Sequence, residues 1–205
     1  MRPAASALAA GAIALLAAGC GGPDAKDAAG IDLLDADHAG GWKHIGGGGF
    51  KIEGGQAATY GGRGVLYFAA RPFADFLLTL EFMQESQEAD SGVFVRFPDP
   101  GGDPAVPAEK GYQVEIGPVL NGTNQGLGAI DNVATPINDV PARPAGQWNT
   151  LQVRCVGQSY AVSLNGRTVT RHTGDRSLRG YVGLQNHDGG SIVHFRNLRI
   201  RELGP

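Results

Sequence analysis

Cysteine is nearly absent from this chain, which has two cysteines among 205 residues. Cys20 ends an apolar N-terminal segment, and Cys155 lies in the run LQVRCV. Two isolated cysteines provide neither a disulfide framework nor a cysteine cluster for a metal. Cys155 alternates with Leu151 and Val153, a pattern that predicts a small buried hydrophobe rather than a reactive thiol.

Excess charge and helical periodicity are also missing. The 17 Lys and Arg residues face 20 Asp and Glu residues, which gives a formal net charge of −3 and no basic stripe. Nucleic acid is therefore a poor candidate partner. No long window places apolar residues at helical spacing, while the chain contains 33 glycines and 12 prolines. This composition predicts a chain of strands and turns.

The first 30 residues have the pattern of a targeting segment. Residues 1–19 combine a basic start with an apolar run too short to span a bilayer, as in a signal peptide. The run ends in LLAAGC, which resembles the bacterial lipobox and implies that Cys20 is acylated; the alternative is an ordinary secretory signal with an incidental cysteine. Residues 20–30 then form a flexible tether. We expect a lipid-anchored cell-envelope protein, periplasmic or in the outer membrane, with one domain over residues 31–205.

Strands are predicted wherever apolar and polar residues alternate. In DFLLTLEFM, Phe76, Leu78, Leu80 and Phe82 share one face. The same alternation marks residues 91–97, 111–117, 150–156, 159–164, 167–172, 180–186 and 191–203. Asn165-Gly166 between two of these runs is a strong hairpin signal. Strands joined by turns rather than helices predict an all-β antiparallel β-sandwich.

Three of the predicted strands carry unusual outward residues. Arg96, the pair Gln113 and Glu115, and the pair Gln185 and His187 each lie opposite the apolar row of their strand. If the strands are neighbours, these groups form one patch that suits a polyhydroxyl ligand such as a sugar. The long segments 98–110 and 117–147 form either walls around such a site or solvated connections.

Each of these residues also has an ordinary interpretation. Glu115 is either a general base or a charged residue on an exposed strand. Arg96 either orients a ligand or forms a surface ion pair. His187 either exchanges protons near neutral pH or lies at a solvated loop tip. Asp131 and Asp188 are turn formers by default.

The runs DSGVFVR, GYQVEI, GAIDNVATP, WNTLQVRCVGQSYAVSLNG and GLQNHDGGSIVHFRNLRI occur in the order seen in a known family. Over roughly residues 40–203 the chain resembles the bacterial 3-keto-disaccharide hydrolase domain. The resemblance implies a concanavalin-A-like jelly roll with a concave sheet. It also implies cleavage of disaccharides or glycosides whose glucose unit is oxidised at carbon 3. The family usually reads GYEVQI, so the acid at Glu115 is two residues further along the strand here.

The resemblance implies a division of roles. Glu115 or His187 would remove the proton at carbon 2, and Arg96, Gln113, Gln185 and Asp131 would bind hydroxyl groups. A divalent metal ion could polarise the ketone, although the sequence identifies no ligands for it. Two alternatives stay open, a glycan-binding module without hydrolysis and an interaction domain of a cell-envelope complex.

Overall fold

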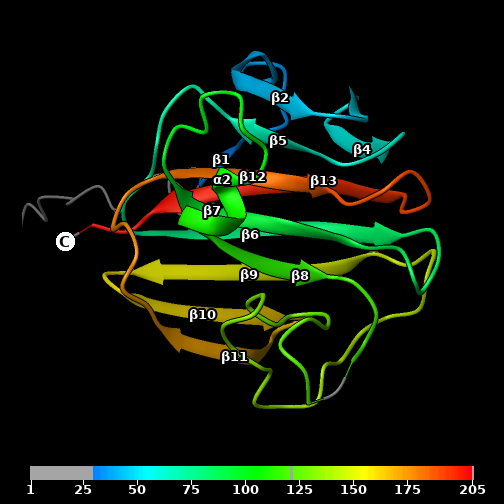
Figure 1. The fold of residues 1–205 in the computed structure, drawn as a ribbon, viewed down its shortest axis with the longest axis vertical. Helices are drawn as coiled ribbons and strands as arrows, with labels where there is room; N and C mark the ends of the chain where they lie inside the picture. The colour runs from blue at the N-terminus through cyan, green and yellow to red at the C-terminus, as the bar shows by residue number, and fades with distance from the viewer. Residues whose placement is uncertain (1–29, 121, 205) are drawn as a thin grey trace, which may run out of the picture.

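The computed structural model describes residues 30–120 and 122–204, which form two antiparallel β-sheets packed face to face (Figure 1). The eight-stranded sheet has the order β11-β10-β9-β6-β13-β4-β3, and β1 also pairs with β13. Its strands are β1 (Ile31–Asp32), β3 (Gly49–Glu53), β4 (Gln56–Tyr60), β6 (Phe76–Gln84), β9 (Asn149–Val156), β10 (Ser159–Leu164), β11 (Arg167–Thr173) and β13 (Val193–Glu202). The predicted all-β sandwich is confirmed.

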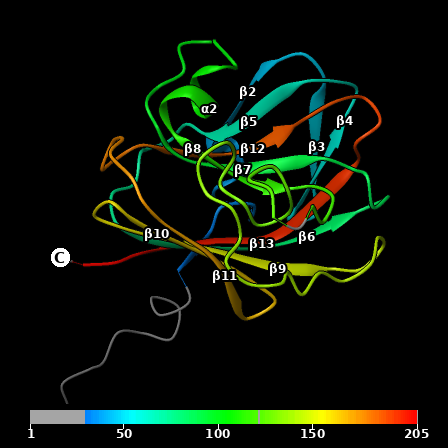
Figure 2. The ribbon, with the colours of Figure 1, turned by 60° about the horizontal axis from the view of Figure 1, so that its bottom comes forward.

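The five-stranded sheet has the order β2-β5-β12-β7-β8. Its strands are β2 (Trp42–Gly46), β5 (Gly64–Phe68), β12 (Tyr181–Asn186), β7 (Ser91–Phe97) and β8 (Tyr112–Ile116). Figure 2 shows the two sheets as separate layers. The short helix α2 (Val106–Lys110) lies within the segment 98–110, which the sequence predicted as a loop, and a 3-10 turn η1 covers Ala39–Gly41.

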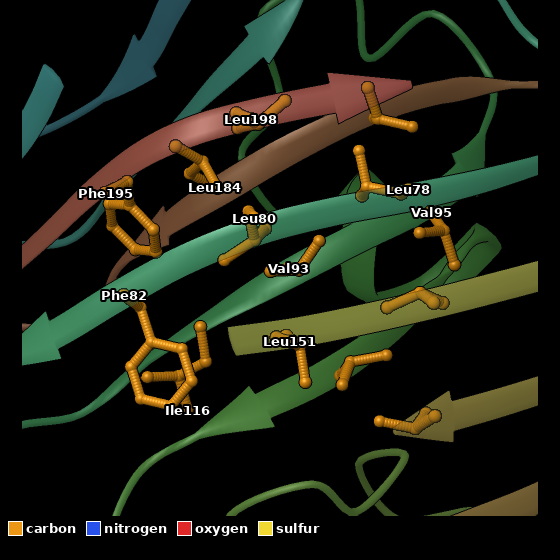
Figure 3. Packing of buried hydrophobic residues seen from close by; sticks show 14 of the residues in the cluster. Leu78, Leu80, Phe82, Val93, Val95, Ile116, Leu151, Leu184, Phe195 and Leu198 are labelled. Carbon is orange, nitrogen blue, oxygen red and sulfur yellow. The ribbon is translucent and has the colours of Figure 1, made fainter. Parts of the chain in front are cut away.

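The core lies between the two layers (Figure 3). Phe76, Leu78, Leu80 and Phe82 of β6 are at most 1% exposed and point into it, as their alternation predicts. They meet inward residues of the other sheet, such as Val93. Full burial of a side chain of this size contributes about 1.5–3 kcal/mol, so the alternating rows account for most of the cohesion between the layers.

Two local predictions also hold. Asn165 and Gly166 connect β10 to β11 with positive φ angles of 47° and 83°, as a tight hairpin of this type requires. Cys155 is a buried free thiol on the core side of β9. Burial raises the pKa of its thiol to about 12, so it remains protonated and inert at neutral pH.

Candidate functional site

A pocket of about 550 Å³ lies on the outer face of the five-stranded sheet. Its floor consists of side chains that point away from the core on four adjacent strands and the residue that follows β12. The floor residues are Val65, Phe94, Gln113, Glu115, Gln185 and His187. Four of the residues that the sequence predicted as one patch therefore lie around one pocket.

Strand register explains why these residues meet. Gly183 of β12 lies opposite Phe94 of β7, which lies opposite Gln113 of β8. Two residues further along the same pair of strands, Gly92 of β7 lies opposite Glu115 of β8. A Cβ atom at Gly92 would come within 2.9 Å of the Gln113 side chain, so the glycine leaves the space in which that amide lies. Alternation along each strand thus directs these side chains to the outer face of the sheet. Gly183 and Gly92 on the two central strands have no side chains there and leave the floor open.

The walls come from the two long segments flanking β8. Pro104, Ala105 and Ala108 belong to the segment that contains α2, and Pro118 and Leu120 belong to the segment that follows β8. These side chains are apolar, whereas the floor is mainly polar. The pocket therefore has the composition of a ligand site, in which apolar walls enclose a few oriented polar groups.

Glu115 is the most perturbed acid of the pocket. Its side chain is buried, and this burial, together with the nearby charges of Asp131 and Asp90, raises its pKa to about 9. The Gln113 amide opposes the rise without cancelling it. Burial also raises the pKa of Asp90 and of Asp131. Glu115 therefore carries a proton at neutral pH and can donate a hydrogen bond.

His187 forms a pair with Asp188 at the end of β12. The His187 Nδ1 atom lies 2.9 Å from Asp188 Oδ2, and the backbone N–H groups of Gly190 and Ser191 donate to Asp188 Oδ1 at 2.7 and 2.8 Å. The hydrogen bond from His187, followed by that from Gly190, lowers the pKa of Asp188 to about 2. An ionised Asp188 favours the proton on Nδ1, which leaves Nε2 as the acceptor nitrogen.

Two buried oxygen atoms at the pocket lack hydrogen-bond donors among the described residues. They are Oδ1 of Asp90 and Oε1 of Gln185, and both residues line the pocket. A buried acceptor without a donor costs about 1–3 kcal/mol. A hydroxyl group is a suitable donor for either oxygen.

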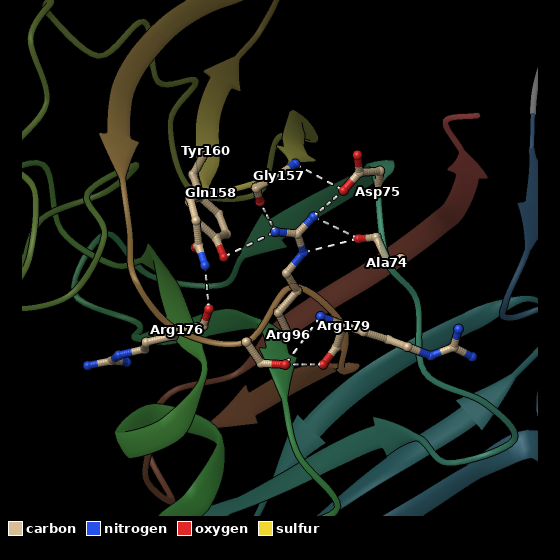
Figure 4. Close-up of polar contacts among 9 residues, drawn as sticks. Ala74, Asp75, Arg96, Gly157, Gln158, Tyr160, Arg176 and Arg179 are labelled. Atoms are coloured by element: carbon tan, nitrogen blue, oxygen red, sulfur yellow. Dashed lines mark hydrogen bonds and ion pairs between the residues drawn. The ribbon is translucent and has the colours of Figure 1, made fainter. Parts of the chain in front are cut away.

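Arg96 does not line the pocket, which corrects the prediction from alternation. Figure 4 shows the polar contacts that it makes instead. Its side chain is fully buried, and the guanidinium donates to the carbonyls of Ala74 and Gly157 and to Asp75 Oδ1. The cause is a β-bulge. Val95 and Phe97 pair with consecutive residues of β12, so Arg96, with φ of 55°, is the extra residue.

The bulge also reverses the face of Phe97. Alternation placed Phe97 with Val93 and Val95, but its ring packs against Phe94 and Tyr67 on the outer side of the sheet. Arg96 instead holds together the turn between β9 and β10 and the segment before β6. It is a structural residue at the edge of the core.

Three residues at or beside the pocket were not indicated by the alternation. Asp90 precedes β7, Asp188 follows β12, and Arg63 precedes β5, so all three lie outside the alternating runs. Asp188 was interpreted as a turn former, and its hydrogen bonds to Gly190 and Ser191 do stabilise a turn. The DGG run after a polar strand was the only signal for it.

The residues of the pocket do not form a metal site. Within residues 30–120 and 122–204, no group of three His, Cys, Asp or Glu side chains is arranged to hold an ion. The predicted signal peptide and the lipidation at Cys20 lie outside the described residues. None of the helices in the described ranges has both the length and the apolar composition needed to cross a membrane.

The fold is shared with sugar-related proteins. Two proteins from Parabacteroides distasonis, both provisionally named glycosyl hydrolases, are 22% and 20% identical to this chain. They cover 79% and 80% of it and 99% and 89% of their own lengths, with TM-scores of 0.65 and 0.67. The carbohydrate-binding module CBM66 of Bacillus subtilis is 17% identical over 79% of this chain and 96% of its own, with a TM-score of 0.57. At these identities the likeness establishes the fold alone.

A search among curated proteins gives no match. The profile of one domain family, described as the 3-keto-alpha-glucoside-1,2-lyase-like domain, matches residues 30–201. This match spans both sheets, every strand that forms the pocket and the bulge at Arg96. The chain therefore belongs to the family of 3-keto-alpha-glucoside-1,2-lyase-like domains.

Proposed function

We propose that this protein breaks the bond at carbon 1 of a 3-keto-glucoside held in the pocket and that water then adds to the product. The observation that carries the proposal is the buried carboxyl group of Glu115, whose pKa of about 9 keeps it protonated. It shares the pocket with the pair of His187 and Asp188. Membership of a family described by a 3-keto-glucoside lyase supports this substrate class.

The chemistry requires an acid and a base. A ketone at carbon 3 acidifies the hydrogen on carbon 2, and removal of that proton lets the C1–O bond break by elimination. The acceptor nitrogen Nε2 of His187 takes the proton from carbon 2. The carboxylic acid of Glu115 donates a hydrogen bond to the ketone oxygen, where negative charge develops. The protonated His187 can then protonate the departing alcohol.

Hydration completes the cycle. Water adds to carbon 1 of the unsaturated ketone, its proton passes to His187, and carbon 2 is protonated again, so the net reaction is hydrolysis. This assignment makes Glu115 the acid and His187 the base, since a protonated carboxyl group cannot accept the proton of carbon 2. The carbonyl and amide groups of Gln113 and Gln185 and the carboxylates of Asp90 and Asp131 would bind hydroxyl groups.

Turnover of an oxidised sugar tests the proposal directly. Purified protein is incubated in D₂O with 3-keto-trehalose and with a 4-nitrophenyl 3-keto-glucoside, and products are identified by NMR. We expect alcohol release and deuterium at carbon 2 of the 3-keto-glucose product. The corresponding glucosides without the ketone should stay intact. Binding without cleavage would instead make the protein a glycan-binding module, and cleavage without deuterium at carbon 2 would contradict the elimination.

Replacement of His187 by alanine is expected to lower kcat/KM about 100-fold, because the general base is lost. Asp188→Asn should lower kcat about tenfold with little change in KM, because the amide no longer holds the proton on Nδ1. His194→Ala is the matched control, since His194 also contacts a carboxylate, at 2.8 Å from Glu85, but lies on the other sheet. Equal losses in His187→Ala and His194→Ala would remove His187 from the chemistry.

We also propose that the protein acts in the cell envelope, anchored by a lipid on Cys20. The lipobox-like run LLAAGC supports this location. Mass spectrometry of the N-terminal peptide from isolated membranes should find an acylated Cys20. An unmodified peptide in the soluble fraction would contradict the anchor.

A further inference from the structure

Three arginines form one row across the outer face of the eight-stranded sheet, on the opposite side of the sandwich from the pocket. Arg171 of β11 lies opposite Ala161 of β10, which lies opposite Arg154 of β9. The row continues through Leu77 of β6 to Arg201 of β13. Adjacent strands are about 4.8 Å apart, so the row extends over about 19 Å. Arg154, Ala161 and Leu77 point away from the core, because both neighbours of each along its strand belong to it. Arg171 follows the buried Thr170 and Arg201 follows the core residue Ile200, so both alternate outward in the same way.

A hollow lies at one end of the row. It has a volume of about 260 Å³, and Arg154 and Arg171 flank it on either side of the small residue Ala161. Ser159 and Thr173, which are paired across β10 and β11, add hydroxyl groups to its lining. No acidic side chain lines the hollow among the described residues. Two guanidinium groups and two hydroxyls around a space of this size suit a phosphate group.

The charge of this row is not neutralised within the described parts of the chain. Arg199, Arg196 and Arg71 each form an ion pair with an acidic residue. In residues 30–120 and 122–204, Arg154, Arg171 and Arg201 form none. On the face opposite its pocket, a chain with a formal net charge of −3 thus carries three arginines in one row without an ion-pair partner among these residues.

We propose that this row docks onto an anionic membrane surface and that the hollow between Arg154 and Arg171 takes a lipid phosphate. The described chain begins at Gly30, beside the row, because Ile31 pairs with Ile200, the neighbour of Arg201. In the predicted lipoprotein, the tether from Cys20 therefore reaches the domain at the edge of the arginine row. Docking by this face turns the pocket away from the lipid.

Vesicle binding tests the proposal on residues 21–205, which contain every described element and lack the predicted anchor. Sedimentation is measured with vesicles of phosphatidylcholine alone and with 30% phosphatidylglycerol. We expect binding only with phosphatidylglycerol, and a loss of roughly 100-fold in the triple variant Arg154→Ala, Arg171→Ala, Arg201→Ala, at about fivefold per arginine. Raising the salt to 0.5 M should weaken the wild-type binding.

A control triple variant removes the same charge elsewhere. Lys43→Ala, Lys110→Ala and Arg179→Ala are exposed changes on β2, at the end of α2 and before β12. This control should bind phosphatidylglycerol vesicles within about twofold of wild type. If both variants lost the same amount of vesicle binding, the net charge of the protein alone would explain the loss, and the proposal would be overturned. Equal binding to both vesicle types would also overturn it, as would displacement by millimolar inorganic phosphate at constant ionic strength, which would indicate a site for a free anion.

Discussion

An Arg96→Met variant is expected to unfold with a free energy lower than wild type by about 3–5 kcal/mol, the usual cost of removing one partner of a buried charged network. Arg96 is fully buried, and its guanidinium contacts four partners in two other segments of the chain. Methionine fills a similar volume but donates no hydrogen bond. The carbonyls of Ala74 and Gly157 would lose their donor, and the Asp75 carboxylate would lose its cation.

The geometry of this network makes the loss specific to arginine. Nε and Nη2 both donate to the Ala74 carbonyl, at 3.0 and 2.8 Å, while Nη2 also reaches Asp75 Oδ1 at 2.8 Å. Nη1 donates to the Gly157 carbonyl and lies 3.3 Å from the hydroxyl of Tyr160. A lysine ammonium can satisfy only part of this fork, so Arg96→Lys should lie between wild type and Arg96→Met.

Urea denaturation followed by circular dichroism measures the effect. Arg179→Met is the matched control, because Arg179 is exposed and its replacement should change the free energy of unfolding by less than about 0.5 kcal/mol. If Arg96→Met fails to fold, the free energy of unfolding of Arg96→Lys is compared with that of the Arg179 control instead, and the expected difference is smaller. Equal midpoints for the Arg96 and Arg179 variants would contradict a structural role for this network.

Much of the pocket could be predicted because its floor lies on regular strands. Alternation fixed the outward faces of Gln113, Glu115 and Gln185, and the β12-β7-β8 order of the sheet then brought these faces together. The same rule fixed the buried row of β6. The order of strands in a sheet depends on long-range pairing. From the sequence alone, these side chains are therefore expected to form one patch only if their strands are neighbours.

Arg96 could not be placed because a β-bulge is a local exception to alternation. The run SGVFVRF reads as seven regular positions, and nothing inside it indicates the extra residue. The clue lies 84 residues away, at Gly180, where a Cβ atom would come within 2.4 Å of the Arg96 backbone. Asp90 was not identified from the sequence, and the pairing of Asp188 with His187 was not predicted, for a different reason. Both acids lie in connections whose course depends on tertiary contacts.

The proton on Glu115 also depends on tertiary contacts. A carboxyl group on a strand has an ordinary pKa until burial and the acids of other segments raise it, here those of Asp131 and Asp90. The sequence therefore identified the residue but not its protonation state. In the proposed elimination, this proton makes Glu115 an acid rather than a base. The raised pKa also makes the stability of the protein depend on pH in a definite direction.

Glu115→Gln is expected to raise the free energy of unfolding by about 4 kcal/mol at pH 7.5. The carboxyl group keeps its proton up to a pKa of about 9 in the folded chain and loses it near its ordinary value of 4.5 in the unfolded chain. Unfolding therefore releases a proton between these values, and each pH unit above 4.5 lowers the stability by about 1.4 kcal/mol. The stabilising effect of the raised pKa is complete below pH 4.5 and is lost as the pH rises toward 9. Glutamine has no proton to release.

The pH series separates this effect from a change in packing. Urea denaturation of wild type and Glu115→Gln should give similar stabilities near pH 4.5 and curves that diverge up to pH 9. Glu88→Gln, which removes an exposed carboxylate, should follow the wild-type curve. Because the glutamine amide still donates a hydrogen bond, Glu115→Gln should keep about a tenth of the activity and lack the wild-type decline above pH 9. Parallel stability curves would mean that Glu115 ionises as it does in water, and the acid in the proposed elimination would then have to be another group.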